Sequence, residues 1–581
     1  MNTSLARLLS RRRILVAIGA LFLVVVVAFF VEAVLAGFAM NAAKKDGDAV
    51  VAALNAGDLK GAQAAAAKLE KDARRAHSLT DDPLWWMGSQ VPWLGNNVAD
   101  VHDSAAALDA IANSSLPTLL HLANEVEHGS LRPHAGRIDP AAIAALAPSV
   151  RQAAAAIDGP ATTVGKMSTS GLIPPLDSLM TQVKERVAQA KVAIDAAANA
   201  FQVLPAMLGG NGPRTYVLLV QNPAEIRSSG GLPGTWALIH ADNGRLTMTS
   251  TTFLAALIQD TPPVPLTADE SALFGSQFGT APGDISQSPD FPRVAEIARA
   301  IERRKGVDVD AVFSVDPVAL SYVLGGTGPV TLKPGLVLTA PVAVPFLMNQ
   351  LYALNDATEQ NTMFSLAARK TFDALVHGQG NQVNAIRGLV EGVMRHRVLA
   401  WSPDPDIAKV INGTGLSGAF PTNTGSTPQV GVYLNEGIAG KPDYYLRQSS
   451  VVTSMSCHSG VQTLKLQSSF QSTMPANMRQ PWIVGTGEFA PRGHMLLVTY
   501  LAAPWQGGID SITVNGVQTT VSGGQLGGRQ IAVLSLDLAP GKLITVTATM
   551  HTGAGQSGDG KLTWTPGMSS DTNPSNFGSS C

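Results

Sequence analysis

The feature that most constrains this chain is a long apolar run near its N-terminus. Residues 14–31 contain no charged side chain, and four arginines precede them: Arg7, Arg11, Arg12 and Arg13. After Glu32 the apolar residues resume as far as Met40. A helix of about 20 such residues crosses the hydrocarbon core of a membrane, and a basic flank stays on the cytoplasmic side. We therefore predict a cytoplasmic tail over residues 1–13, a transmembrane helix over residues 14–40 and a body outside the cytoplasm.

A cleaved signal peptide is the alternative reading of this segment. The triplets "VLA" and "GFA" offer small residues for cleavage. The apolar region of a signal peptide spans only about 7–15 residues, so the longer run favours a single-pass anchor in the cell membrane. Either reading exports the rest of the chain.

Length and composition bound the classes of protein that the chain can represent. Its 581 residues exceed a single hydrophobic core, which indicates several domains. Hydrophobic residues make up 45%, too many for general disorder. The net charge is −2, and no basic cluster recurs after the N-terminus, so we expect no nucleic-acid partner.

The pattern of residues predicts a multidomain α+β protein. Residues 41–205 are rich in alanine and other strong helix formers, which favours a helical bundle or stalk. Within them, "DDPLWWMGSQVPWLG" holds three tryptophans. These could sit at the lipid headgroups, or they could plug the core of the bundle, the interpretation that we prefer.

After residue 205 strand patterns begin. Asn243-Gly244 between two strand-like runs predicts a hairpin. Residues 288–332 then read helix, strand, helix, strand, with Asp290 and Asp316 placed to cap the helices. This alternation predicts an α/β layered domain over residues 206–430. Short strands separated by turn residues, including a hairpin at 514–517, predict a β-sandwich over residues 431–581.

The chain has two cysteines, Cys457 and Cys581. In an exported protein an even number permits a disulfide, which would tie down the Gly/Ser-rich tail. Two unrelated thiols are the alternative. Neither CxxC nor Cys/His zinc spacing occurs, so the sequence shows no structural metal motif.

The stretch "NPAEIRSSGG", residues 222–231, follows the first predicted strand, where ligands of open sheets bind. Gly230 and Gly231 would let backbone N–H groups approach a ligand, and Ser229 stands beside them. Arg227 could hold a phosphate or carboxylate with two hydrogen bonds, and Glu225 could accept from a sugar or join a metal. Alternatively, Glu225 and Arg227 pair with each other and the glycines form a bend. Residue chemistry alone favours this alternative.

Three aspartates, Asp308, Asp310 and Asp316, could share one strand face and hold Mg²⁺. A polar strand end and a helix cap are the simpler interpretation. Arg293 could join other arginines in an anion-binding cleft, although a solvated helix face is more usual. No HExxH, G-x-S-x-G, S-x-x-K or Walker motif is present, so common hydrolase and NTPase chemistry has no support.

Two blocks of sequence resemble the bacterial domain-of-unknown-function family 4012. They are "YVLLVQNPAEIRSSGGLPGTWALIHADNGRL" and "DFPRVAEIARAIERRKGVDVDAVFSVDPVALSYVLGGTGPVTL", and "DYYLR" at residues 443–447 adds to them. Family members also have an N-terminal anchor and an alanine-rich region with a "P-x-L-G" element, here "PWLG". The resemblance implies a location in the cell envelope and no established activity.

A more distant likeness is to LytR-CpsA-Psr phosphotransferases, which move glycans from polyprenyl-pyrophosphate lipids to the cell wall. It implies that Arg227 takes the place of their phosphate-binding arginine. The aspartate of their "R-S-D-T" pattern is replaced here by Ser229. Because that carboxylate is expected to act with the metal and the pyrophosphate, its loss argues against phosphotransferase catalysis.

Two functional hypotheses follow. In the first, an extracytoplasmic envelope protein takes part in cell-surface glycan assembly or attachment by binding a phosphorylated lipid or glycan, with Glu225 or Asp308 and Asp310 assisting Mg²⁺. In the second, the chain is a non-catalytic surface scaffold or adhesion protein whose partners are other envelope proteins. We favour a role in envelope assembly, and we favour a non-catalytic protein over an enzyme.

Overall fold

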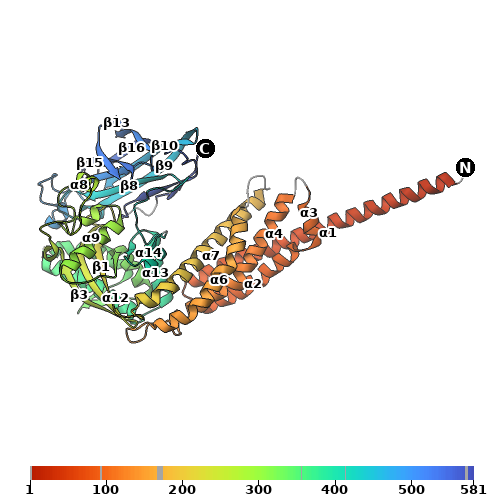
Figure 1. Ribbon diagram of the computed structural model, residues 1–581, viewed down its shortest axis with the longest axis horizontal. Helices are drawn as coiled ribbons and strands as arrows, with labels where there is room; N and C mark the ends of the chain where they lie inside the picture. Colours follow the sequence, from red (N-terminus) through yellow and green to blue (C-terminus); the bar gives the residue numbers. More distant parts are fainter. Residues whose placement is uncertain (1–2, 92–94, 167–173, 355, 413, 569–572) are drawn as a thin grey trace. The chain divides into compact units, whose positions relative to one another are not determined.

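The computed structural model describes residues 3–91, 95–166, 174–354, 356–412, 414–568 and 573–581 (Figure 1). The chain divides into two compact units. The first contains residues 1–132 and 139–205, and the second contains residues 133–138 and 206–581. Helices dominate the first unit, and several sheets with their helices form the second. The predicted multidomain α+β fold with one N-terminal apolar helix is confirmed.

The first unit is an array of helices. Its long first helix, α1 (Thr3–Asn55), is followed by a series of partners, namely α2 (Leu59–Thr80), α3 (Pro83–Ser89), α4 (Gly95–Ala110), η1 (Ile111–Ser115), α5 (Leu116–Glu127), α6 (Pro140–Lys166) and α7 (Pro174–Met207). Alanines fill many of the contacts between helices. Ala62 and Ala66 of α2, for example, pack with Val50 of α1 and Leu120 of α5.

Helix α1 holds a stretch, Val26–Leu54, that is long and apolar enough to cross a membrane by length and composition. The helix does not end at residue 40, where hydropathy alone placed the end of the membrane segment, but continues to Asn55. Ala36, Ala39 and Met40 are buried in the core of the helical unit. The C-terminal end of the predicted membrane segment is therefore part of the bundle.

The tryptophans of the bundle have different surroundings. Trp85 is buried, and its ring centroid lies 5.6 Å from that of Phe29 on α1. Trp86, its neighbour on α3, is 68% exposed. Trp93 and the "PWL" part of the "PWLG" element lie outside the described residues. Trp85 thus agrees with the core-plug interpretation, whereas Trp86 does not.

The second unit begins with a five-stranded sheet of order β3-β2-β1-β4-β7. Its strands are β1 (Arg214–Asn222), β2 (Leu232–Asp242), β3 (Arg245–Phe253), β4 (Ala311–Val315) and β7 (Val398–Trp401). Strand β1 runs parallel to β4 and antiparallel to β2. Asn243 and Gly244, with φ of 46° and 84°, form the predicted two-residue hairpin between β2 and β3.

Helices cover both faces of this sheet. Val217 and Leu219 of β1 pack with α9 (Phe291–Arg304), whereas Tyr216 belongs to a cluster on the other face that includes Phe372 of α12 (Ala357–Val376). The remaining helices and short strands are η2 (Leu254–Leu257), α8 (Ala268–Phe274), η3 (Ile285–Gln287), α10 (Pro317–Thr327), β5 (Val330–Lys333), β6 (Leu336–Leu338), α11 (Ala340–Met348), η4 (Gln350–Leu354), α13 (Gln382–Met394) and α14 (Pro405–Ile411).

The C-terminal strands form two further sheets, of order β13-β12-β16-β10-β9 and β14-β15-β11-β8-β17-β18. The strands are β8 (Gln429–Glu436), β9 (Leu446–His458), β10 (Val461–Ser472), β11 (Met495–Ala502), β12 (Gly508–Val514), β13 (Val517–Gln518), β14 (Ser522–Leu526), β15 (Arg529–Leu538), β16 (Leu543–His551), β17 (Gly560–Trp564) and β18 (Asn576–Phe577). Two short helices, η5 (Pro442–Tyr445) and α15 (Pro481–Val484), lie between strands.

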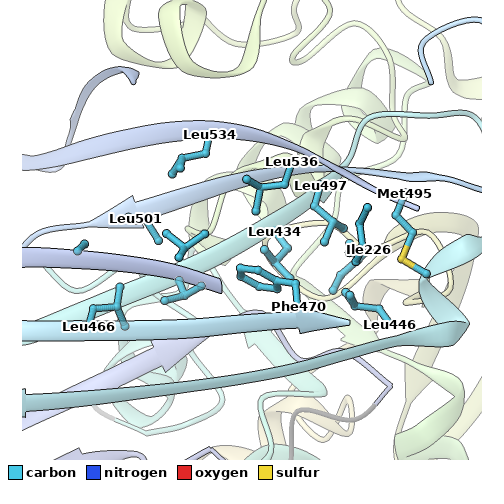
Figure 2. Packing of buried hydrophobic residues seen from close by; sticks show 14 of the residues in the cluster. Ile226, Leu434, Leu446, Leu466, Phe470, Met495, Leu497, Leu501, Leu534 and Leu536 are labelled. Carbon is cyan, nitrogen blue, oxygen red and sulfur yellow. The ribbon is translucent and has the colours of Figure 1, made fainter. Parts of the chain in front are cut away.

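Apolar side chains from both of these sheets meet in one core, as expected for a sandwich (Figure 2). Leu466 and Phe470 of β10 face Leu434 of β8 and Leu497 of β11 there. Ile226, from the loop after β1, is fully buried in the same core. A residue of the α/β sheet's own loop therefore packs inside the sandwich, and the two regions form one compact unit.

A disulfide bond joins Cys457, near the end of β9, to Cys581. Hydrogen bonds support the same tail, because the Ser580 backbone N–H donates to Ser454 Oγ at 3.2 Å and the Ser579 hydroxyl donates to the carbonyl of Ser557 at 2.7 Å. The tail therefore lies along the edge of the sandwich.

Candidate functional site

The loop of residues 222–231 connects β1 to β2, and all of it is buried. Three backbone hydrogen bonds shape it: Glu225 N–H donates to the carbonyl of Asn222 at 3.1 Å, Gly230 N–H to that of Arg227 at 2.8 Å, and Leu232 N–H to that of Glu225 at 3.0 Å. Gly230 has φ of 134°, a conformation that residues with a Cβ rarely adopt. The loop is thus a compact turn in the interior of the second unit.

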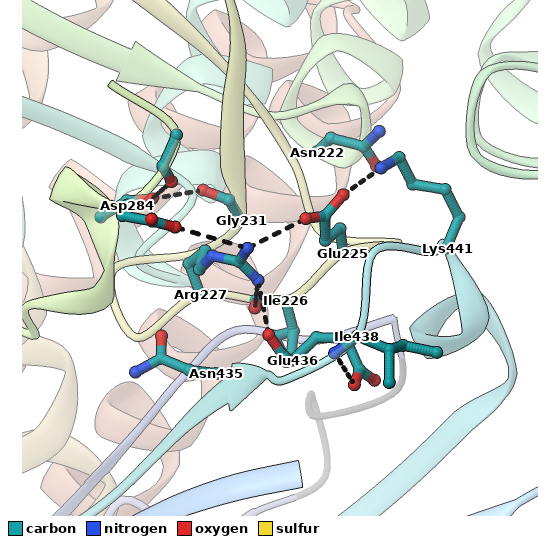
Figure 3. A network of polar contacts seen from close by, with 12 residues as sticks. Asn222, Glu225, Ile226, Arg227, Gly231, Asp284, Asn435, Glu436, Ile438 and Lys441 are labelled. Carbon is teal, nitrogen blue, oxygen red and sulfur yellow. Dashed lines mark hydrogen bonds and ion pairs between the residues drawn. The ribbon is translucent and has the colours of Figure 1, made fainter. Parts of the chain in front are cut away.

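Arg227 lies at the centre of a polar network (Figure 3). Its Nη2 donates to Glu225 Oε1 at 2.9 Å and lies 3.8 Å from Asp284 Oδ1. Its Nη1 donates to the backbone carbonyls of Glu436 at 3.0 Å and Ile226 at 3.1 Å. The side chain is only 7% exposed. The guanidinium therefore binds groups of the protein itself.

Glu225 is held between two cations. Its Oε1 accepts from Arg227, and its Oε2 is paired with the ammonium group of Lys441. Burial by itself would raise the pKa of Glu225, but the charges of Lys441 and Arg227 outweigh it and lower that pKa. Glu225 is consequently ionised and bridges the loop to the chain that follows β8.

Backbone hydrogen bonds join the loop to the sandwich directly. Glu436 N–H, at the end of β8, donates to the carbonyl of Ile226 at 2.9 Å. Ile226 N–H donates to Asp443 Oδ2 at 2.9 Å, and Asp443 N–H donates to the carbonyl of Ala224 at 3.1 Å. Residues 224–226 are therefore held from both sides by the segment 436–443.

The second half of the loop has its own partners. Ser228 N–H donates to Asn435 Oδ1 at 2.8 Å, and the Thr565 hydroxyl donates to the carbonyl of Ser228 at 3.0 Å. The Ser229 hydroxyl donates to the carbonyl of Ser286 at 3.2 Å, and the Ser286 hydroxyl donates to that of Gly231 at 3.0 Å. The groups proposed for ligand contact are thus bound to the sandwich and to η3.

Glu436 and Asp443 form a buried carboxyl pair behind Ile226. Burial, together with the nearby Glu436, raises the pKa of Asp443 well above its usual range, and burial also raises the pKa of Glu436. Asp443 Oδ1 and Glu436 Oε2 have no hydrogen-bond partner among the described residues. The nearby Glu436 carboxyl disfavours ionisation of Asp443, so Asp443 keeps its proton to a higher pH than a free carboxyl group.

The other sequence candidates lie elsewhere. Arg293 donates to Glu270 of α8 at 2.6 and 3.0 Å and to Glu296 at 2.7 Å, so it fastens α8 to α9. Asp308 is an exposed carboxylate 3.3 Å from Arg303. Asp310 accepts from Arg214 at 2.9 Å and from Thr215 N–H at 2.8 Å. None of these contacts involves a residue of the 222–231 loop.

Asp310 and Asp316 lie at opposite ends of β4. Ala311 pairs with Tyr216 and Val315 pairs with Val220, so Asp316 is the aspartate near the end of β1. It caps α10 through Ala319 N–H and accepts from Arg397 at 2.7 Å. The three aspartates therefore do not form one Mg²⁺ site. Within the described ranges, no group of three or more His, Cys, Asp or Glu side chains is placed to hold a metal ion.

The sequence did not single out Glu436, Lys441 or Asp443 as parts of this network. Asp443 opens the "DYYLR" motif, and Glu436 and Lys441 belong to "NEGIAGKPD", which begins at the end of the buried strand β8. Charged residues at and shortly after the end of a buried strand are a signal that could have found them. Their common partner, the 222–231 loop, lies more than 200 residues earlier. No local sequence pattern therefore indicates that these residues contact it.

This part of the chain is an α/β domain. Its first loop, residues 222–231, is bound through the Arg227 network to the β-sandwich that follows. Residues 211–352, which include this loop, match the family model described as "Protein of unknown function (DUF4012)". The chain thus carries a domain of that family, as its two sequence blocks predicted. No curated protein and no solved structure matches the chain significantly.

Proposed function

We propose that this protein is a membrane-anchored component of a bacterial cell envelope that acts outside the cytoplasm as a non-catalytic scaffold. The observation that carries the proposal is the burial of the 222–231 loop, the strongest family motif in the chain. Its charged side chains bind each other and the sandwich: Arg227 holds Glu225, and Glu225 holds Lys441. Such an arrangement makes a rigid body out of two folded regions.

Two further observations support the location. Helix α1 is long and apolar enough to cross a membrane, and the arginines before it would stay in the cytoplasm. The disulfide between Cys457 and Cys581 suits an oxidising compartment. Together they favour an anchor with the folded units on the outer side.

Binding of a phosphorylated lipid or glycan at Arg227 is the competing function. It would require the guanidinium to leave Glu225 and the carbonyl of Glu436, both in the interior. Breaking a buried ion pair of this kind costs about 3–5 kcal/mol. A scaffold function therefore fits the contacts of Arg227 and Glu225 better than an anion-binding function. Any role of the protein in cell-surface glycan assembly would then be indirect, through the envelope proteins that the scaffold holds together.

A binding experiment separates the two functions. The full chain would be placed in lipid nanodiscs and titrated with a polyprenyl phosphate, and its melting temperature and bound ligand would be measured. We expect no saturable binding, either in the wild type or in Glu225→Gln, which removes the charge that competes for Arg227. Saturable binding that tightens in Glu225→Gln would overturn the scaffold proposal in favour of an anion site.

A cellular experiment tests the scaffold itself. In a strain lacking the protein, we expect altered sizes of envelope protein complexes on native gels, with lipid-linked glycan precursors at wild-type levels. Accumulation of such a precursor with unchanged complexes would instead indicate a missing transfer step. Restoring the full chain, but not a chain without residues 1–25, should reverse the defect, because this deletion shortens the apolar helix and keeps the residues that pack in the core of the helical unit.

A further inference from the structure

The short helix α3 (Pro83–Ser89) has an exposed face that is apolar. Trp86 is 68% exposed and Met87 is 48% exposed, and Pro83, one turn earlier, is exposed as well. Residues spaced by three and four positions lie on one side of a helix. A helix on the surface of a water-soluble body normally turns polar residues outward, so this face has an unusual composition for contact with water.

Helix α3 is fastened to the membrane-crossing helix. The Trp85 ring lies 5.6 Å from the Phe29 ring, centroid to centroid. A Cβ added at Gly88 would lie 2.8 Å from Cε2 of Phe29, so the backbone of α3 lies directly against that side chain. The depth of Phe29 along α1 therefore fixes the depth of α3.

The position of Phe29 can be estimated from helix geometry. A hydrocarbon core of about 30 Å takes about 20 helical residues at 1.5 Å per residue. Counted from Ile14, the first residue after the arginines, such a span ends near Ala33. Phe29 lies about one helical turn before that point. On this count, helix α3 lies within about one helical turn of the outer boundary of the hydrocarbon core.

The exposed side of α1 changes character just beyond this boundary. Between Val27 and Phe38 the large exposed side chains are apolar, namely Val27, Phe30, Val31, Val34, Leu35 and Phe38. From Asn41 onward exposed polar residues follow, including Lys44 and Lys45. The headgroup region adds several ångströms on each side of the hydrocarbon core, which accommodates the few residues between Ala33 and Phe38.

We propose that α3 is a membrane-interface element that inserts Trp86 and Met87 into the outer headgroup layer. Tryptophan prefers this layer because its ring is apolar and its N–H is polar. With α1 crossing the bilayer and α3 resting on it, the helical unit is held at two points and cannot rotate freely about α1. The inference rests on the proposed anchor, since without a spanning helix α3 has no membrane beside it.

Fluorescence quenching by brominated lipids tests this contact. The full chain would be reconstituted in vesicles whose lipids carry bromine on the acyl chain close to the headgroup, and tryptophan emission would be compared with that in unbrominated vesicles. We expect quenching in the wild type and a loss of much of it in Trp86→Phe. The matched control is Trp482→Phe, which removes another exposed tryptophan, 41% exposed in the sandwich, and should leave the quenched part of the signal unchanged.

The outcomes also separate this inference from the proposed anchor. Flotation of the chain with the vesicles after a high-pH carbonate wash reports insertion of α1. If the chain floats and Trp86→Phe is quenched as much as the wild type, the contact of α3 with lipid is refuted while the anchor stands. If the chain does not float, both fail. A detergent-solubilised dimer that Trp86→Gln converts to a monomer would show that a second copy, not lipid, covers this face.

Discussion

Asp443 Oδ2 accepts a hydrogen bond of 2.9 Å from the backbone N–H of Ile226, although 217 residues separate them. The Ile226 side chain lies in the sandwich core, and its backbone belongs to the first loop of the α/β sheet. One residue is thus held by its side chain and by both of its backbone polar groups, because its carbonyl accepts from Glu436 N–H. This bond makes the stability of the loop depend on the sandwich.

Asp443→Ala should therefore destabilise the second unit. The substitution leaves a buried N–H without an acceptor, which costs about 1–3 kcal/mol. Asp443→Asn is the matched control, since its amide oxygen can still accept from Ile226 and its NH₂ group can donate to Glu436. The measurement is urea denaturation of the full chain in detergent. An equal loss in both variants would contradict the importance of this acceptor.

The same residue should give stability a dependence on pH. Burial raises the pKa of Asp443 in the folded chain, so its contribution is complete at low pH and is lost as pH rises through the folded pKa. Glu225 acts in the opposite direction: its pKa is lowered, and its contribution is lost as pH falls through that value. We expect a maximum of stability between these limits. Denaturation midpoints from pH ~4 to pH ~9 should fall less steeply on the alkaline side in Asp443→Asn than in the wild type.

The parts of the fold that could be predicted from the sequence depend on nearby residues. The hairpin at Asn243-Gly244 needs only two positive φ angles, and Asp316 caps a helix three residues away. Asp290, in contrast, has a hydrogen-bond partner that is distant in the sequence. It occupies the cap position before α9, but its side chain accepts from Phe420 N–H instead, 130 residues further on.

The candidate site divides in the same way. Residue chemistry alone favours pairing of Glu225 with Arg227, because the two residues are only two positions apart in the sequence. The depth of the loop and its link to Lys441 depend on how the sandwich packs, which no local pattern encodes. Hydropathy changes near Met40, but no helix-breaking signal follows there and α1 continues to Asn55, so hydropathy alone does not show where the helix ends.

The two glycines of the loop should be intolerant of substitution. A Cβ at Gly231 would lie 2.4 Å from the backbone carbon of Asn222, which cannot move away without displacing β1. Gly231→Ala should therefore sharply reduce the yield of folded protein. Gly234→Ala is the matched control, because nothing lies within 4 Å of its added Cβ. Folded yield can be measured as the monodisperse fraction of detergent-purified full chain, and similar yields for both variants would argue against a tightly packed loop.

Reduction of the disulfide should loosen the C-terminal tail before it affects the α/β sheet. The bond closes a loop of 124 residues, for which the chain-entropy model gives about 4–5 kcal/mol of stabilisation. Only short hydrogen-bonded contacts, such as Ser580 to Ser454, would then hold the end of the chain. Limited proteolysis with and without a thiol reductant should show earlier cleavage after residue 565 in the reduced protein. The Cys457→Ser variant should be cleaved equally fast in both conditions, and reductant-dependent cleavage of this variant would mean that the effect does not come from the disulfide.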